Sequence, residues 1–395
     1  MKFTINRAAL LERISTAAKA ITIPNPRPAY TGLWIHAGQD HLSIMGTDEN
    51  FTIQTLIMPG ELTMLDVQEP GDMVLESRFL IEIVRKMDGS RITIETESPE
   101  DRGRDIAIIS DENNTYRMNY RNAESHQSLS ITPKAELFTV PGKIIKEIVQ
   151  TVGYCVASET ESRVVLKGIN LQASGNSVEA GATDSFRMSL MKIPVEDAEK
   201  PGIHVLNPEE PLDFSLTIPI RPLRELSRSI SDDETVYVTI DRRNIRFDYD
   251  KTTFTTTLQE GRFPDLKSII PPEDKVTTVL TVNGSELQRL VDRATIFYST
   301  DNEAMRFIMS EQEMKLFSSK TGVGDSCLTM MDYEVQGQGL KLTCNGRYLL
   351  EALRAVQPQE NIQIHFCGEL GPFRIEDPGH PEQISVIVPI RSYEW

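Results

Sequence analysis

The chain has few of the residues that carry covalent or metal chemistry. Its 395 residues include only two tryptophans, six histidines and four cysteines. The cysteines form no Cys-x-x-Cys pair and none of the close spacings of a small disulfide scaffold; they are Cys155, Cys327, Cys344 and Cys367. We therefore expect reduced, partly buried thiols, as is typical of a cytosolic protein.

Motifs of catalysis and nucleotide binding are also missing. No His-Glu-x-x-His, Gly-x-x-x-x-Gly-Lys-Ser/Thr or Gly-x-Ser-x-Gly segment occurs. Gly322-Val-Gly324 has no helical pattern behind it and is predicted to be a turn. Carboxylates such as Asp101 and Asp105 fall in polar stretches, where a solvated loop is the ordinary interpretation. We expect no enzyme, no cofactor and no metal, while a metal-dependent enzyme of replication or repair stays open as the alternative.

No apolar run approaches the length of a membrane span. The first residues, Met1 to Ile5, read as the opening of a strand and contain no apolar secretory core. With 39% hydrophobic and 25% charged residues, the composition is that of an ordinary globular protein. These features predict a cytoplasmic protein without a membrane segment.

What the chain does have is an internal repeat. Three distant segments share the pattern Arg-x-Leu-x-Glu-x-x-Arg, and they span Arg78–Arg85, Arg221–Arg228 and Arg347–Arg354. On a helix the two arginines lie about two turns apart and share one face, with the leucine on the opposite face. One such helix is most simply a solvated face with salt bridges. Three copies predict a triplicated fold that has a use for its basic face.

The repeat extends to the segments before and after these helices. Alternating runs beginning at Phe3, Phe138 and Leu280 each lead into a cap or turn residue and an amphipathic helix. Their starts lie 135 and 142 residues apart, which is the size of a domain and too long for a solenoid. Short Thr, Val and Ile runs separated by Asp, Asn and Gly favour antiparallel strands. The sequence predicts an α+β fold with three repeated domains, each with two helices packed on antiparallel sheets.

Helices and boundaries follow from the same pattern. Polar residues 123–134 and the proline-bearing residues 265–275 are the candidate linkers. We predict domains at residues 1–134, 135–275 and 276–395. The predicted helices are residues 7–20, 77–88, 141–152, 221–230, 284–298 and 345–356.

The charge distribution separates these helices from the rest of the chain. The chain has a net charge of −17, which by itself opposes nucleic-acid binding. The six predicted helices hold 15 basic and 8 acidic residues, a net +7 that leaves −24 for the remainder. A surface made of the helices would be positive. The simpler alternative, that helices tolerate arginine and lysine, does not explain why the equally tolerated glutamate is not in excess.

Four motifs, in order, resemble a known family. Ala182-Thr-Asp-Ser-Phe-Arg-Met-Ser189 resembles the Ala-Thr-Asp-Gly/Ser-His-Arg-Leu-Ala/Ser signature of bacterial DNA polymerase III beta subunits, the sliding clamps. Glu260–Leu266 is similar to the family's Glu-Gly-Lys/Arg-Phe-Pro-Asp-Tyr. The segments starting at Asn345 and at Val386 resemble its later helix and its ending. The resemblance covers all three predicted domains.

This resemblance implies a non-catalytic processivity factor. Such clamps are head-to-tail homodimers in which each chain forms half of a ring around duplex DNA, with helices lining the hole. A helix lining that touches phosphates holds DNA without reading its sequence. The implied partners are duplex DNA, a second copy of the chain, the polymerase III alpha subunit, a clamp loader and other proteins with a clamp-binding motif.

The resemblance and the repeat together nominate DNA-contacting residues. Arg27, Arg78, Arg221 and Arg262 match family positions, while Thr160 stands at a further one and is a poorer phosphate donor. Placement on the predicted helices adds Arg7, Lys146, Arg224 and Arg228. For any one arginine, a surface salt bridge is the competing interpretation. A sequence-specific DNA-binding protein suits neither the charge nor the absence of a recognition-helix motif.

The resemblance also implies a pocket for a short partner peptide with hydrophobic anchors. The matching positions are Leu166, Thr183, Arg187, Met188, Pro264, Ile269, Asn345, Tyr348, Val386, Val388, Pro389 and Ile390. For each apolar residue, domain core is the competing interpretation. Three departures stand out: Phe186 replaces the usual histidine, Ser268 replaces an arginine of some clamps, and the chain ends with the extra segment Ser392–Trp395.

The dimer interface is nominated by three apolar positions. Tyr116, Ile296 and Phe297 match sites where the family buries side chains between subunits. Without a partner, exposed apolar side chains of this kind are a liability.

Overall fold

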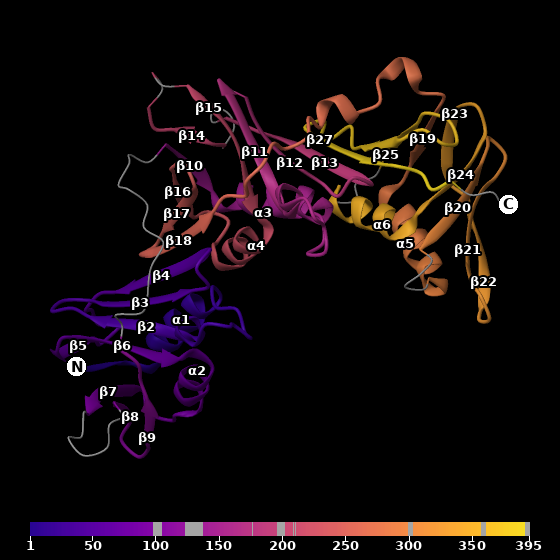
Figure 1. Cartoon of the computed structure of the whole chain (residues 1–395). Helices are drawn as coiled ribbons and strands as arrows, with labels where there is room; N and C mark the ends of the chain where they lie inside the picture. The colour runs from indigo at the N-terminus through magenta and orange to yellow at the C-terminus, as the bar shows by residue number, and fades with distance from the viewer. Residues whose placement is uncertain are drawn as a thin grey trace. The chain divides into compact units, whose positions relative to one another are not determined.

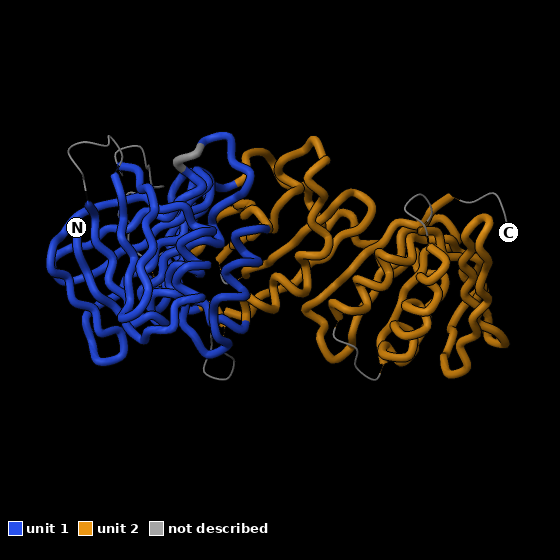
Figure 2. The backbone as a smooth tube through the Cα atoms, turned by 90° about the horizontal axis from the view of Figure 1, so that it is seen from below, with its two compact units in different colours: residues 1–143, 204–207, 221–258 blue, residues 144–203, 208–220, 259–395 orange. Residues whose placement is uncertain are grey.

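A computed structural model describes residues 1–97, 105–122, 137–175, 177–195, 202–207, 209, 211–298, 303–356 and 361–391; of Pro28 and Ala29 only the backbone is described. The chain divides into two compact units, coloured separately in Figure 2. Unit 1 holds residues 1–143, 204–207 and 221–258, and unit 2 holds residues 144–203, 208–220 and 259–395. We describe each by itself.

Unit 1 contains two antiparallel sheets. The first has five strands in the order β5 (Asp66–Glu69), β1 (Lys2–Asn6), β7 (Arg91–Glu97), β8 (Ile106–Ser110) and β9 (Thr115–Asn119). The second has nine strands in the order β14 (His204–Val205), β10 (Phe138–Pro141), β16 (Thr235–Ile240), β17 (Asn244–Tyr249), β18 (Thr252–Thr257), β4 (Phe51–Ile57), β3 (Leu42–Thr47), β2 (Gly32–Ala37) and β6 (Gly71–Glu76).

Three helices accompany these sheets (Figure 1): α1 (Arg7–Ala18), α2 (Ser77–Lys86) and α4 (Ile220–Ser229). Helix α1 begins at Arg7 because the Asn6 side chain accepts hydrogen bonds from the amides of Ala8 and Ala9, at 2.9 and 3.2 Å. The helix packs on β3 and β4. The approach is so close that a Cβ on Gly46 would lie 2.2 Å from the carbonyl oxygen of Ala17, so this position requires glycine.

Unit 2 repeats the arrangement with a nine-stranded and a four-stranded sheet. The nine strands run β15 (Leu212–Pro219), β11 (Gly168–Gly175), β12 (Ser177–Thr183), β13 (Arg187–Ile193), β27 (Gln383–Ile387), β26 (Phe373–Glu376), β25 (Ile362–Phe366), β19 (Thr278–Val282) and β23 (Tyr333–Gly337). The four run β22 (Gly324–Met330), β21 (Met314–Lys320), β20 (Ala304–Met309) and β24 (Leu340–Asn345).

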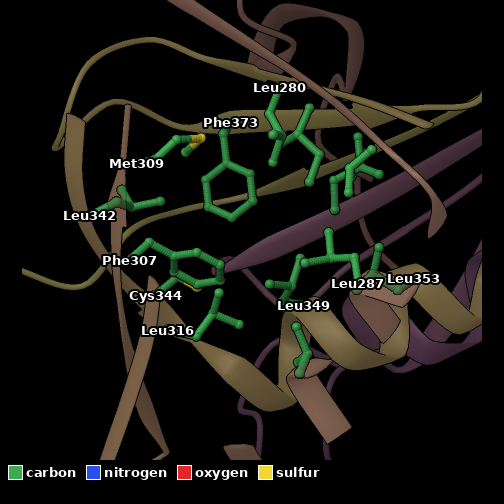
Figure 3. Packing of buried hydrophobic residues seen from close by; sticks show 14 of the residues in the cluster. Leu280, Leu287, Phe307, Met309, Leu316, Leu342, Cys344, Leu349, Leu353 and Phe373 are labelled. Carbon is green, nitrogen blue, oxygen red and sulfur yellow. The ribbon is translucent and has the colours of Figure 1, made fainter. Parts of the chain in front are cut away.

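The helices α5 (Gly284–Ala294) and α6 (Gly346–Ala355) lie side by side in unit 2 (Figure 1). Their caps are Asn283 and Asn345, whose side chains accept from amides of the first turn. Helix α3 (Gly142–Val152) falls almost wholly in this unit. The core fills the space between helices and sheets, with Leu287, Leu349, Phe307 and Phe373 pointing toward one another (Figure 3).

The α+β class and the repeated strand and helix pattern are confirmed by these elements. Three predicted helices were too long. The helices predicted at residues 7–20 and 77–88 end two residues early, at Ala18 and Lys86, and residues 284–298 form α5 only to Ala294, with residues 295–297 in a 3₁₀ turn. The predicted boundary near residue 134 lies outside the described residues, and both boundaries stay predictions. Each nine-stranded sheet joins strands from two predicted domains, through β18 beside β4 in unit 1 and β13 beside β27 in unit 2.

Candidate functional sites

Helix α2 carries the first copy of the arginine pattern with its charges facing solvent. Leu80 and Val84 are buried, while Arg78 and Arg85 are exposed. Arg85 pairs with Glu82 on its own helix. The amphipathic helix predicted from the pattern is confirmed.

Arg221, the first arginine of the second copy, already has partners within unit 1. Its guanidinium bonds to the Asp48 carboxylate and the Thr22 hydroxyl, and it donates to the carbonyls of Lys19 and Ile21 at 3.0 and 3.1 Å. It therefore fastens α4 to the end of α1 and to the turn after β3. The salt-bridge interpretation describes what Arg221 does in this structure, and its contact with DNA stays a prediction.

The other nominated DNA-contacting residues are spread over both units. Arg27 is exposed and pairs with Glu49, and Arg228 is exposed and pairs with Glu225. Arg7 donates to the carbonyl of Arg85 at the end of α2, at 3.3 Å. Arg224 is exposed on α4, Arg262 is exposed after β18, and Lys146 is half-buried on α3. Thr160 bonds to the Ser158 hydroxyl at 2.8 Å.

All twelve nominated pocket residues belong to unit 2. Met188 on β13 and Val386 on β27 are direct partners across the sheet, and both are buried. They form a small apolar cluster with Leu190 and Leu266. Leu166 is buried in a neighbouring cluster. These three nominated residues are packed as core, which agrees with the competing interpretation for them.

The remaining nominated residues are more accessible. Ile269, Val388 and Ile390 are each nearly two-fifths exposed. Pro264, Pro389 and Tyr348 are half-buried. Thr183 is buried and donates its hydroxyl to the Arg187 carbonyl at 2.7 Å, and the Asn345 side chain caps α6 and donates to Glu303.

Arg187 is the charged centre of this region. Its side chain is only 9% exposed. The guanidinium lies between the rings of Tyr154 and Tyr348, 5.2 and 4.2 Å from their centroids. It bonds to Asp184 at 2.9 Å and to Glu351 of α6. A buried arginine held by two carboxylates and two aromatic rings has one fixed position.

Two neighbours of Arg187, Tyr154 and Cys155, are uncharged near pH 7 and so do not form ion pairs with it. Burial raises the pKa of the Tyr154 hydroxyl and of the Cys155 thiol, so both are neutral near pH 7. Tyr154 instead donates to the Ser385 hydroxyl at 2.8 Å. Sequence reasoning missed Tyr154 and Glu351, and the only available signal was that Glu351 lies within the third arginine pattern.

A cavity of about 530 Å³ opens beside this arginine. Its wall includes Phe186, Arg187 and Tyr348 together with residues of the turn after Cys155. In that turn, the Arg163 amide and then its guanidinium lower the pKa of Glu161 to about 2. The cavity therefore combines exposed aromatic surface with a carboxylate that is charged near pH 7.

The departures from the family pattern have simple local structures. Phe186 is 61% exposed at the tip of a turn, next to Ser185 with its positive φ of 80°. Ser268 bonds to the carbonyl of Asp265 at 2.7 Å. The extra segment Ser392–Trp395 lies outside the described residues.

The nominated interface residues lie on or near strands at sheet edges. Tyr116 is 38% exposed on β9, the last strand of its sheet. Ile296 is 72% exposed, and Phe297 packs next to Gly324 at the start of β22, the last strand of the four-stranded sheet. The described strands leave one side of β9 and of β22 without a ladder partner.

The alternative of a metal-dependent enzyme gains no support. Within the described ranges, no group of three or more His, Cys, Asp or Glu side chains is placed to hold a metal ion. All four cysteines are free thiols, with Cys155 and Cys344 buried. Over the same ranges, no helix is long and apolar enough to cross a membrane.

Family models match nearly all of the chain, and a known protein matches its full length. Models of the N-terminal, central and C-terminal domains of the DNA polymerase III beta subunit match residues 1–130, 139–265 and 267–391. The Bacillus subtilis protein named beta sliding clamp is 26% identical over 398 residues, with full coverage of both chains.

Solved structures agree. The DNA polymerase sliding clamp from Bacillus subtilis has a TM-score of 0.89 at 25% identity and full coverage of both chains. The beta subunit from Streptococcus pyogenes, at 23% identity, shares the fold with a TM-score of 0.87, covering 99% of this chain and 100% of that one. From the three consecutive family matches, the chain belongs to the DNA polymerase III beta subunit family.

Proposed function

We propose that this protein is a DNA sliding clamp, a non-catalytic processivity factor that encircles duplex DNA and tethers a replicative polymerase. The observation that carries the proposal is the match of three family models, in order, across the chain. Full-length similarity to proteins named as sliding clamps supports it. The compartment that we propose is the bacterial cytoplasm.

The ring would form from two copies joined head to tail. Among the described strands, β9 in unit 1 and β22 in unit 2 each have one side without a ladder partner, and such an edge is a template for pairing with another chain. Tyr116 near one edge and Phe297 near the other supply apolar surface. Because the two edges differ, the contact between two copies is heterologous. Such contacts form a closed ring when the rotation that relates successive copies leads back to the first copy.

DNA would be held by exposed arginines without reading its sequence. Arg78 and Arg262 are exposed, and no ion pair is recorded for either among the described residues. Such side chains contact phosphates, and the contacts weaken with salt. Because retention would come mainly from the closed ring, the contacts need only be loose enough to permit sliding.

Partner proteins would bind through a short peptide at the pocket around Arg187. Ile269, Val388 and Ile390 offer accessible apolar surface, while Met188 and Val386 lie buried in the core together with Leu266. A few fixed polar groups beside apolar surface suit a peptide with hydrophobic anchors. The polymerase alpha subunit and the clamp loader are the partners that we propose for this site.

The decisive experiment compares circular and linear DNA. The protein is loaded onto a nicked plasmid by a matched clamp loader with ATP, the complex is isolated, and the plasmid is then cut. Stable association with the circle and rapid loss after cutting are expected of a closed ring that slides off ends. Equal retention on both forms would mean that binding is not topological, and the proposal would fail.

A further inference from the structure

Residues 259–275, here called the strap, cross one face of the nine-stranded sheet of unit 2. The strap starts at β15, where the Gln259 amide donates to the Thr217 carbonyl at 2.9 Å. It then passes over β12, where a Cβ on Gly181 would lie 2.5 Å from Cδ1 of Leu266. The glycine therefore allows the strap to lie directly on the sheet.

The middle of the strap is held by apolar packing. Leu266 is buried against Met188 and Val386, and Ile270 packs against the same cluster. The Ile269 amide donates to the Leu266 carbonyl at 3.0 Å, which turns this part of the strap into a 3₁₀ helix. The accessible side chain of Ile269 is thus presented from a short, turned segment.

The end of the strap is held by a buried arginine. Arg374 on β26 is the cross-strand partner of Val386 on β27, so the two side chains lie on the same face as the apolar cluster. Arg374 is 8% exposed. Its guanidinium donates to the Pro271 carbonyl at 2.8 Å and bonds to the Glu273 carboxylate. One side chain therefore grips both the backbone and a side chain of the strap.

Two side chains of the sheet also lie beside Arg374. His365 on β25 lies beside it, with Nδ1 3.4 Å from the guanidinium, and Glu376 lies 2.7 Å from its Nε. Burial and then the charge of Arg374 lower the pKa of His365, so the ring is neutral near pH 7. The hydrogen bond from Arg374 lowers the pKa of Glu273, which keeps its carboxylate charged.

We propose that Arg374 is a positioning residue for the peptide pocket. It fixes the end of the strap and thereby the segment that presents the accessible side chain of Ile269, one of the residues assigned to that pocket. The stretch between Leu266, held by packing, and Pro271, held by Arg374, is only four residues long. Ile269 within it has little freedom while both anchors hold. The inference rests on the proposed function, because it deepens the assignment of that pocket.

The test measures the opening of the strap and the peptide affinity of the pocket separately. Lys267 on the strap has a side chain 61% exposed, so trypsin cleavage after Lys267, followed by mass spectrometry, reports how often the strap lifts. Pocket affinity is measured with a labelled short peptide bearing hydrophobic anchors, selected from a panel by its binding to the wild-type protein. We expect Arg374→Gln to speed cleavage after Lys267 and to weaken peptide binding, each by about tenfold.

Two further variants allow the same test if Arg374→Gln folds poorly. Glu273→Gln removes one grip through a side chain that is 71% exposed, so we expect a normally folded protein with a smaller change of the same sign in both measurements. Arg374→Lys keeps the charge but not the forked contact, and it should restore part of both losses. Arg246→Gln, which breaks an arginine–carboxylate pair with Asp248 on β17, is the matched control and should change neither.

The outcomes separate the two proposals. Unchanged cleavage after Lys267 in both Arg374→Gln and Glu273→Gln would overturn the anchoring role. Faster cleavage with unchanged peptide affinity would overturn the positioning role. If the wild-type protein binds none of the peptides, the pocket assignment under the proposed function fails, and the cleavage rates still decide whether Arg374 anchors the strap.

Discussion

Helices α2 and α6 carry the same arginine pattern and use it differently. In α2, Glu82 pairs with Arg85 on the same helix, and Arg78 is exposed. In α6, every charge of the pattern is paired with another element: Arg347 with Glu303, Glu351 with Arg187 and Arg354 with Asp292. One amphipathic pattern thus builds an open basic face in unit 1 and a brace for a buried arginine in unit 2.

The largest expected effect comes from removing Arg187, the buried arginine that Glu351 of α6 holds. Arg187→Ala leaves Asp184 and Glu351 without their partner and two tyrosine rings without packing. We expect a loss of about 3 kcal/mol in the free energy of unfolding, measured by urea denaturation, together with loss of peptide binding. Arg85→Ala on α2 is the matched control and should cost less than about 1 kcal/mol. Equal losses of unfolding free energy in Arg187→Ala and Arg85→Ala would contradict the difference between the two helices.

The second prediction concerns the edge strands β9 and β22. Phe297→Asp puts a charge beside the β22 edge, and we expect it to raise the dissociation constant of the dimer at least about tenfold. Light scattering over a range of concentrations measures the mass. Leu370→Asp, at a residue 63% exposed elsewhere in unit 2, should leave the mass unchanged. A dimer that withstands Phe297→Asp would remove this residue from the interface.

The third prediction separates the arginines of the first and second copies. Arg221→Ala removes four contacts within unit 1 and should lower its stability by about 1 kcal/mol, whereas Arg78→Ala should change it by less than about 0.5 kcal/mol. The double variant should be lost faster from circular DNA at moderate salt while remaining a dimer. Unaltered loading and retention would remove both residues from the DNA face.

The smallest expected effect concerns pH. The pKa of His365 is lowered from 6.5 in the folded protein, so below pH 6.5 the unfolded state takes up the proton more readily. The stability that the neutral ring contributes is present above pH 6.5 and is lost as the pH falls through the folded pKa. Urea midpoints between pH 5 and 8 should therefore fall less steeply toward acid in His365→Gln. Parallel curves for wild type and variant would contradict this assignment.

The sequence was sufficient for the elements that depend on local pattern. The repeat located the six α-helices of the described residues and predicted a cap or turn residue before the helices that follow the first strands, because helix periods and caps depend on contacts over a few residues. It did not predict the partners of Arg221 or Arg187, which lie up to 202 and 164 residues away in the chain. Nor did spacing indicate that the strap lies on the sheet, because that depends on Gly181 leaving room for Leu266.

The two nine-stranded sheets have a consequence for how the chain comes apart. The sequence repeats three times, but the described elements fall into two compact units, and the middle repeat contributes β10 and β16 to the nine-stranded sheet of unit 1 and β11 to β13 to that of unit 2. Segments that share strand ladders and a core unfold together, whichever sequence repeat they belong to. In hydrogen exchange, β10 and β16 should thus lose protection together with unit 1, and β11 to β13 together with unit 2. A chain with three sequence repeats would then unfold as two cooperative units.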